Sequence, residues 1–240
     1  NSLWLDLTNK LNNFPTLAND ISTDVCIIGG GMFGITCSYY LAKLGFKTVI
    51  LEKDTIGSKT TGHTTAKITS GHGLIYNYLC NSYGKGFAKD YLEANEQAIK
   101  NIYEIIENEK IKCDFEYENS YIYTDKQDEI INIKDEVNSL NNIGFNANYV
   151  TKTSLPFNIL GAIQYKNQAS FHPLKYLLGL CKSITNNDGQ IFTNSLVTDV
   201  KNDNNIFYTY VNGKIVKSKY VIIASHFPFI NIPGFYFTKM

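Results

Sequence analysis

The chain has 240 residues, of which 44% are hydrophobic and 18% are charged, and its 22 basic residues balance 22 acidic ones. This composition is ordinary for a globular protein and excludes disordered and collagen-like chains. Because there is no net charge, no field draws the protein to nucleic acid or to an anionic membrane. We therefore expect a small-molecule partner, with no nucleic-acid and no membrane partner.

The five cysteines are widely spaced and form no CxxC or CxH pair: Cys26, Cys37, Cys80, Cys113 and Cys181. Such spacing predicts free thiols in a reducing compartment and no metal site. No apolar stretch reaches the length of a membrane span, and the first residues lack a basic start and a cleavage site. We expect a cytoplasmic protein.

A strand, a helix and a second strand are predicted near the beginning of the chain. Residues 24–28 form a short apolar run that ends in three glycines, which is typical of a strand buried in a parallel sheet. In residues 32–44 apolar side chains recur at helical spacing, and Gly45 follows as a C-cap glycine. Residues 48–51 form another apolar run. Together these segments predict one βαβ unit with a right-handed crossover.

The middle of the chain predicts a loop, a long helix and an α+β insertion. Residues 53–73 are rich in Gly, Ser and Thr and predict a long loop, which in compact domains is usually functional. A helix is predicted from Phe87 to about Lys110. Strand and helix patterns then alternate in the insertion, in residues 113–124, 126–141, 147–150 and 162–165.

The last part predicts one helix, at residues 173–183, and then a series of strands at 190–193, 196–201, 207–211 and 220–224. The fold class expected is α/β, a Rossmann-like domain with three layers and a central parallel sheet. We assign residues 1–110 and 170–240 to this discontinuous domain, and residues 111–169 to an inserted α+β substrate domain.

Gly29, Gly31 and Gly34 fit the pattern GxGxxG, with Met32 and Phe33 between the second and third glycine. The first glycine allows a tight turn, the second lets the backbone approach a pyrophosphate, and the third lets helix and strand pack closely. A pyrophosphate would meet the N–H groups at the start of the predicted helix. The alternative is a strand-to-helix turn without a ligand.

Glu52 follows the second predicted strand, twenty-three residues after Gly29. A carboxylate at this position can accept hydrogen bonds from the hydroxyls of an adenosine ribose, and it would repel a 2′-phosphate. The pattern therefore disfavours NADP. We include the adjacent Lys53 among the candidate cofactor-binding residues.

Three stretches resemble the D-amino-acid oxidase-like family of FAD-dependent amine and amino-acid oxidoreductases: residues 57–76, 167–180 and 221–229. The resemblance is strongest to bacterial members whose longer versions carry a C-terminal Rieske iron–sulfur domain, and gamma-glutamylputrescine oxidoreductases are similar. It implies FAD as cofactor and hydride transfer from a C–N bond of an amine or amino acid to the flavin, followed by hydrolysis of the imine.

Members of the family continue well beyond the point that corresponds to residue 240. The resemblance therefore implies that this chain is the N-terminal part of such a protein, either a fragment or a truncated gene product, with the C-terminal part of the fold missing. It also implies that a longer parent chain could contain a Rieske domain.

The resemblance assigns further residues to the flavin site. The backbone of Val197 would contact the adenine, and Ala224 and Ser225 would lie near the pyrophosphate. As an alternative, both segments are buried strand ends without a ligand. The loop would contribute Ser58, Thr64, Thr65 and Ala66, although threonine-rich loops often satisfy only their own backbone.

Lys67 is the candidate catalytic residue, because an ammonium near the flavin could stabilise negative charge on the reduced ring or bind an anionic substrate. The alternative is a solvated loop lysine. Tyr117, Tyr121 and Tyr123 alternate in one predicted strand and could line an amine pocket or serve in packing. All basic residues are lysine, so no guanidinium is present to hold a substrate carboxylate, which favours an amine.

Two other functions remain open at this stage. An NAD-linked dehydrogenase would use the same glycine turn but would have no use for the loop from Gly57 to Lys67. A non-catalytic nucleotide- or flavin-binding module is favoured by the absence of an evident acid–base pair.

Overall fold

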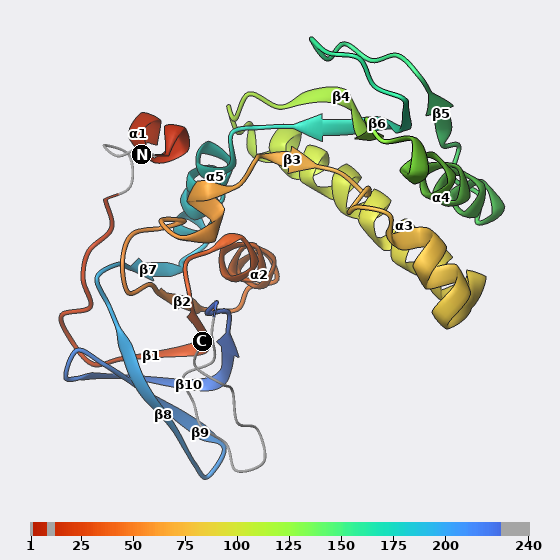
Figure 1. Ribbon diagram of the computed structural model, residues 1–240. Helices are drawn as coiled ribbons and strands as arrows, with labels where there is room; N and C mark the ends of the chain where they lie inside the picture. Colours follow the sequence, from red (N-terminus) through yellow and green to blue (C-terminus); the bar gives the residue numbers. More distant parts are fainter. Residues whose placement is uncertain (1, 9–12, 227–240) are drawn as a thin grey trace. The chain divides into compact units, whose positions relative to one another are not determined.

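The structure is a computed structural model that describes residues 2–8 and 13–226. The chain divides into two compact units (Figure 1). The first contains the described residues of 1–65, 111–113 and 172–240, and the second contains Ala66–Lys110 and Asp114–Phe171. Residues 227–229, the end of the last family-like stretch, lie outside the described residues.

The βαβ unit of the first compact unit is confirmed. It consists of β1 (Ile21–Ile28), α2 (Met32–Lys43) and β2 (Thr48–Leu51). Strand β1 begins three residues earlier than the apolar run predicts, because its first residues, Ile21 to Thr23, pair with the neighbouring strand β10 (Lys214–Ile223). An apolar run in the sequence indicates only the buried part of a strand, whereas backbone pairing also extends through exposed residues.

Six strands form the sheet of the first unit, in the order β7-β2-β1-β10-β9-β8. Strands β7 (Gln190–Phe192), β2, β1 and β10 are parallel, and β9 (Ile206–Val211) and β8 (Val197–Asp203) continue the sheet in antiparallel fashion. The predicted α/β class with a central parallel sheet is confirmed.

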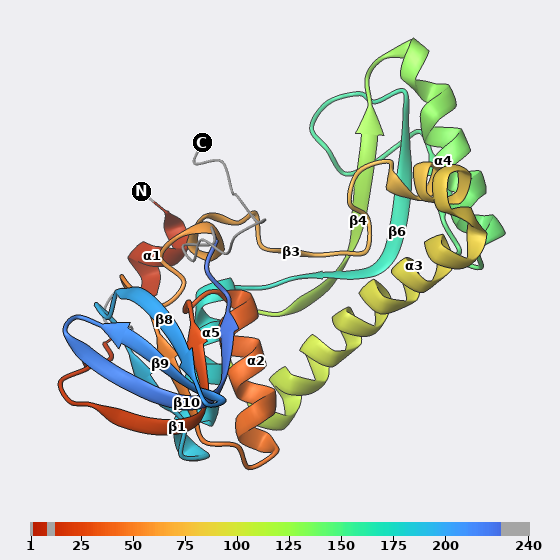
Figure 2. The same ribbon diagram turned by 90° about the horizontal axis from the view of Figure 1, so that it is seen from below.

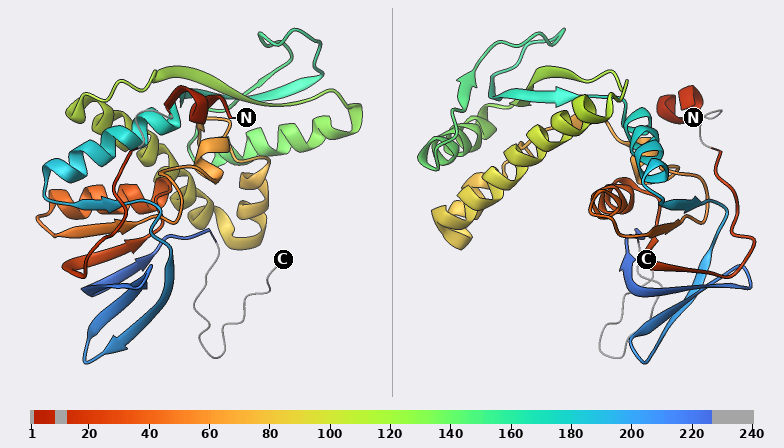
Figure 3. Two further views of the ribbon diagram at one scale, coloured as in Figure 1. Left: turned by 90° about the vertical axis from the view of Figure 1, so that its left-hand side faces the viewer. Right: turned by 180° about the vertical axis from the view of Figure 1, so that it is seen from behind.

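Both faces of this sheet are covered. Helices α2 and α5 (Pro173–Asn186) pack against each other on one face (Figure 3). The other face carries a buried cluster in which side chains of β1 and β2 meet those of the antiparallel strands, namely Leu17, Cys26, Ile28, Val49, Leu51, Val197, Val211 and Val216. Alternate residues of β1 and β2 thus enter different layers, and for this reason the buried residues 25–28 and 49–51 are apolar on both faces.

The second unit is a small sheet covered by two helices (Figure 2). Strands β3 (Lys67–Ile68), β6 (Gly161–Ser170) and β4 (Glu116–Thr124) are adjacent in that order, and β5 (Asn148–Val150) also pairs with β6. Helices α3 (Ile75–Glu109) and α4 (Ile130–Asn142), which follows the short 3-10 turn Gln127–Glu129, pack against the sheet. Their shared core contains Leu79, Leu92, Val137, Leu140, Ile163 and Tyr165.

Helix α3 begins at Ile75, twelve residues before the predicted start, and it contains a non-helical residue, Gly84. Its first turn is held by a carboxylate distant in sequence, since Glu136 accepts the backbone N–H groups of Tyr76 and Asn77 at 2.7 and 2.6 Å. Because α3 packs on α4, residues 66–110 belong to the second unit, whereas the sequence analysis grouped them with the nucleotide-binding domain. That the second unit binds the substrate stays a prediction.

The predicted loop of residues 53–73 contains a 3-10 turn, Thr60–His63, and strand β3. A short helix, α1 (Leu3–Thr8), was not predicted. It anchors the loop, because the indole N–H of Trp4 donates to the carbonyl of Thr64 at 2.9 Å. Within residues 2–8 and 13–226 we find no helix with both the length and the apolar character of a membrane span.

Candidate functional site

A cavity of about 640 Å³ lies where the carboxyl ends of β1, β2 and β10 meet. Ligands of open α/β sheets bind outside the carboxyl ends of the strands. Ten of the predicted cofactor-binding residues line this cavity: Gly29, Gly31, Met32, Phe33, Glu52, Lys53, Ser58, Val197, Ala224 and Ser225. The structure thus brings together four separate segments of the sequence, within residues 28–33, 51–61, 195–197 and 224–226.

Two positions in the turn between β1 and α2 require glycine, because of backbone conformation or close contacts. Gly29 has a φ of 118°, and a Cβ there would lie 2.7 Å from the carbonyl oxygen of Ala224. A Cβ on Gly34 would clash with the carbonyl oxygen of Gly29. These two glycines let the chain turn tightly and let α2 approach the strand.

Gly31 has neither requirement. Its φ of −87° and ψ of −175° are accessible to any residue. A Cβ would meet only the hydroxyl of Thr61, at an ordinary 3.6 Å. The residue is the N-cap of α2 and has no side chain of its own to accept the first N–H groups of the helix. Within the described residues, packing and backbone conformation therefore do not explain a glycine at this position.

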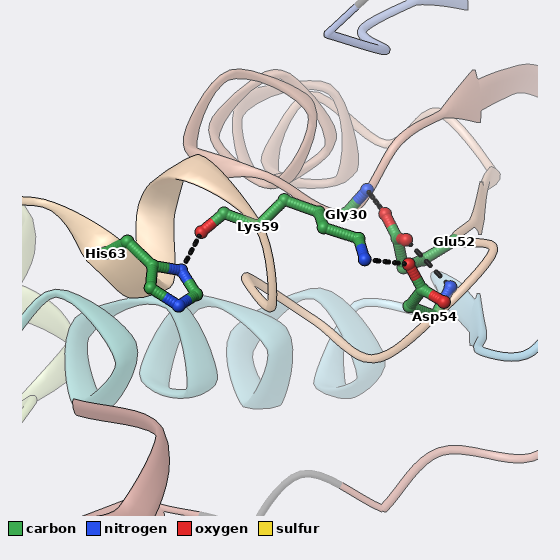
Figure 4. A network of polar contacts seen from close by, with 5 residues as sticks. All are labelled: Gly30, Glu52, Asp54, Lys59 and His63. Carbon is green, nitrogen blue, oxygen red and sulfur yellow. Dashed lines mark hydrogen bonds and ion pairs between the residues drawn. The ribbon is translucent and has the colours of Figure 1, made fainter. Parts of the chain in front are cut away.

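Glu52 holds the turn and the loop after β2 together (Figure 4). One carboxylate oxygen accepts the N–H of Gly30 at 2.7 Å, and the other accepts the N–H of Asp54 at 2.9 Å. Each carboxylate oxygen can accept two hydrogen bonds, so both retain capacity for a ligand hydroxyl. Glu52 therefore has a structural role that the sequence analysis did not predict.

The loop after Glu52 adds polar groups that the sequence analysis did not select. The Thr61 hydroxyl accepts the N–H of Met32 at 3.2 Å, at the start of α2. The ammonium of Lys59 forms an ion pair with Asp54 at 3.0 Å, and the Lys59 carbonyl is 2.8 Å from Nδ1 of His63 (Figure 4). Both Thr61 and Lys59 line the cavity. Their position within the family-like stretch of residues 57–76 was the signal that could have identified them.

Ser58 lines the same cavity with a buried hydroxyl that has no hydrogen-bond partner among the residues that the structure describes. A buried hydroxyl without a partner is costly, and a ligand that accepts its hydrogen would remove that cost.

The remaining predicted residues occupy other places. Gly34 lies behind the turn, at its contact with α2. Thr64 and Thr65 are not among the residues that line the cavity, and the Thr64 carbonyl is used by Trp4. Ala66, with a φ of 60°, begins the second unit. Flavin contacts by Thr64, Thr65 and Ala66 stay predictions.

Lys67 lies in the second unit, where it lines a separate cavity of about 230 Å³. Tyr121 and Tyr123 line the same cavity, as the pocket hypothesis for the tyrosines expects. Tyr117 instead packs in an aromatic cluster, with ring centroids 5.4 Å from Tyr103 and 5.0 Å from Phe115.

Comparison with known proteins agrees with this arrangement. The family model described as FAD dependent oxidoreductase matches residues 24–228. The chain belongs to this family of FAD-dependent oxidoreductases. The match includes the glycine turn, Glu52 and all segments that line the larger cavity. FAD is accordingly the cofactor of the family to which the chain belongs.

Two individual proteins are similar to the chain over nearly its whole length. The chain is 35% identical over 237 residues to a putative Rieske 2Fe-2S iron–sulfur protein of Bacillus subtilis, YhfW, covering 99% of this chain and 46% of the relative. It is 25% identical over 232 residues to the gamma-glutamylputrescine oxidoreductase of Escherichia coli, covering 94% and 54%. The chain thus spans about half the length of these relatives.

Among solved structures, the glycine oxidase of Bacillus cereus superposes with a TM-score of 0.67 at 20% identity, over 83% of this chain and 55% of that chain. At this level of identity the likeness establishes the fold alone. It confirms the predicted FAD-dependent oxidoreductase fold.

Proposed function

We propose that the larger cavity holds the dinucleotide part of FAD, in a protein that oxidises a C–N bond of an amine or amino acid. Gly31 carries this proposal. Its conformation is ordinary and its Cβ position is free, so a bound group that must approach the backbone explains the glycine. FAD, when bound, supplies the oxidising chemistry.

The residues around the cavity fit such a ligand. The start of α2, whose N-cap glycine has no side-chain acceptor, presents N–H groups and the positive end of the helix dipole to a pyrophosphate. Glu52 retains acceptor capacity for ribose hydroxyls, and the Ser58 hydroxyl can donate to an acceptor. The volume of about 640 Å³ lies in the range of cofactor sites.

The first experiment measures FAD binding by the purified chain and by a Gly31→Ala variant. We expect flavin absorption bands on addition of FAD, and release of intact FAD on denaturation. The added methyl group should weaken FAD binding by about tenfold or more while changing the free energy of unfolding by less than about 1 kcal/mol.

Two outcomes would contradict the proposal. A chain that binds NAD and ignores FAD would favour the dehydrogenase alternative. Equal FAD affinity of the original chain and the Gly31→Ala variant would remove the observation on which the site rests. Oxidation of the substrate is tested separately, by screening amines and amino acids for bleaching of the flavin absorption.

We further propose a cytoplasmic location and a Rieske iron–sulfur domain in the full-length protein. The five cysteines, all free, support the location. The similarity to the putative Rieske 2Fe-2S iron–sulfur protein of Bacillus subtilis supports the additional domain. A full-length reading frame without paired Cys and His ligands for a cluster would contradict the second proposal.

A further inference from the structure

The cavity of the second unit has opposite charges on two of its walls. Lys67 on β3 and Glu118 on β4 both line it, together with Tyr121 and Tyr123. Among the described residues that line this cavity, only these two carry a charge. Neither side chain forms an ion pair or a hydrogen bond within the described parts of the chain. A ligand in this cavity would therefore meet an available cation and an available anion.

The two charges come from strands that are not neighbours. Strand β6 lies between them, with Lys67 opposite Ser170 and Glu118 opposite Gln168. Two strand spacings and an offset of two residues separate the Cα atoms of Lys67 and Glu118 by about 12 Å. The separation lets the two side chains bind the two ends of one extended molecule.

A break in the strand pairing brings Glu118 to the cavity. In a regular strand Glu118 would point to the face opposite to Tyr121 and Tyr123, because successive side chains alternate. All three nevertheless line one cavity, and the register of β4 and β6 shifts between Glu118 and Ser120. On β6, Asn167 has a left-handed φ of 56°. Such bulges often redirect a side chain next to an active site.

We propose that this cavity binds an amine that carries an anionic group at the far end of its carbon chain. Glu118 binds the ammonium group, Lys67 binds the anion, and the rings of Tyr121 and Tyr123 contact the carbon chain. In an α-amino acid both charged groups are attached to one carbon, so the molecule spans less of the distance between the two walls. The volume of about 230 Å³ limits the ligand to a small molecule. This substrate class rests on the proposed amine oxidation.

The test is calorimetric titration of the FAD-supplemented chain with four probes of equal carbon number. We expect 6-aminohexanoate to bind about tenfold tighter than hexylamine, hexanoate or the isomer 2-aminohexanoate, because only 6-aminohexanoate has opposite charges at the two ends of its carbon chain. Equal or tighter binding of 2-aminohexanoate, or no binding of any probe, would overturn the proposal.

Substitutions of the two charged residues test which end of the ligand each residue binds. Glu118→Gln should weaken the binding of 6-aminohexanoate and hexylamine about tenfold and leave the binding of hexanoate unchanged. Lys67→Met should instead weaken the binding of 6-aminohexanoate and hexanoate. Glu116→Gln and Lys166→Met are matched controls, because these exposed residues do not line the cavity. Equally large losses of probe affinity in the control variants would contradict the assignment. A chain that binds 6-aminohexanoate but no FAD would contradict only the proposed function, whereas one that binds FAD but no probe would contradict only this substrate class.

Discussion

Glycines in one short turn serve three different purposes. Gly29 is required by its φ of 118°, Gly34 by contact with a backbone carbonyl, and Gly31 by neither. The sequence pattern lists the same residue type at each position, and only the atoms around each position separate these causes. The three positions therefore respond differently to the same substitution.

Gly34→Ala should destabilise the first unit by about 1–3 kcal/mol, because the new methyl group would overlap the Gly29 carbonyl and force α2 away from the turn. Urea unfolding monitored by circular dichroism measures the change. Gly86→Ala is the matched control, since this helical glycine of α3 has nothing near its Cβ position. An unchanged unfolding midpoint for Gly34→Ala would show that α2 can move without cost.

Glu52→Gln should both destabilise the chain and weaken FAD binding. The amide keeps one carbonyl oxygen but turns an N–H₂ group toward either the Gly30 or the Asp54 N–H. Loss of one hydrogen bond with an opposed donor costs about 1–3 kcal/mol. Urea unfolding and FAD titration measure the two effects. The exposed Glu107→Gln should change stability by less than about 0.5 kcal/mol, and an equal loss in that control would refute the assigned role.

At the scale of elements, α3 depends on features outside its own helical pattern. Gly84 interrupts the helix with a φ of 88° and a ψ of 161°, and the preceding segment from Ile75 is held by Glu136 of α4. The apolar spacing after Phe87 predicts the straight part alone. The earlier segment exists because a buried carboxylate replaces a local N-cap.

The pair Gly84→Ala and Gly86→Ala tests this kink. Both positions have free space, but only Gly84 has a left-handed φ. Alanine should therefore destabilise the chain at Gly84 by about 1–2 kcal/mol and stabilise it at Gly86 by about 0.5–1 kcal/mol. Urea unfolding of the two variants measures the difference. Stabilisation by both substitutions would indicate that α3 runs straight through Gly84.

Glu136 should make the stability of the second unit depend on pH. Burial raises the pKa of this carboxyl above its ordinary value of 4.5, against the opposing effect of the N–H groups of Asn77 and Tyr76. A raised pKa means that the fold binds the proton more tightly than the unfolded chain does. The contribution of this proton to stability is therefore full below pH 4.5 and is lost as the pH rises through the folded pKa.

The measurement compares the free energies of unfolding of the original chain and of Glu136→Gln at about pH 4 and about pH 8. The difference between the two proteins should shift in favour of the variant at the higher pH. Glu107→Gln, which removes an exposed carboxyl, should show no such shift. A difference independent of pH would contradict the raised pKa.

At the scale of the whole molecule, each unit has its own buried core and its own cavity. A ligand that binds only the folded first unit stabilises that unit by mass action. At a free FAD concentration of a hundred times the dissociation constant, the gain is about 2.7 kcal/mol. We expect a higher Tm with FAD in differential scanning calorimetry. The Gly31→Ala variant should show a smaller shift at the same FAD concentration, and equal shifts would argue against a site at Gly31.

Local sequence determined the βαβ unit, the glycine turn and the placement of Glu52. These features depend on apolar runs, helical spacing and glycine positions, all within about thirty neighbouring residues, which is the span of a βαβ unit. The family-like stretches added Val197, Ala224 and Ser225, which do line the larger cavity.

Only the tertiary structure decided the features that rest on contacts between distant residues. Trp4 holds the loop at Thr64, Glu136 starts α3 at Tyr76, and Glu118, at the register shift of β4, lines the second cavity together with Tyr121. A hydrogen bond between residues sixty positions apart leaves no periodic trace in either segment. Periodicity reports which face of an element is buried, and the partner that buries it is chosen by packing.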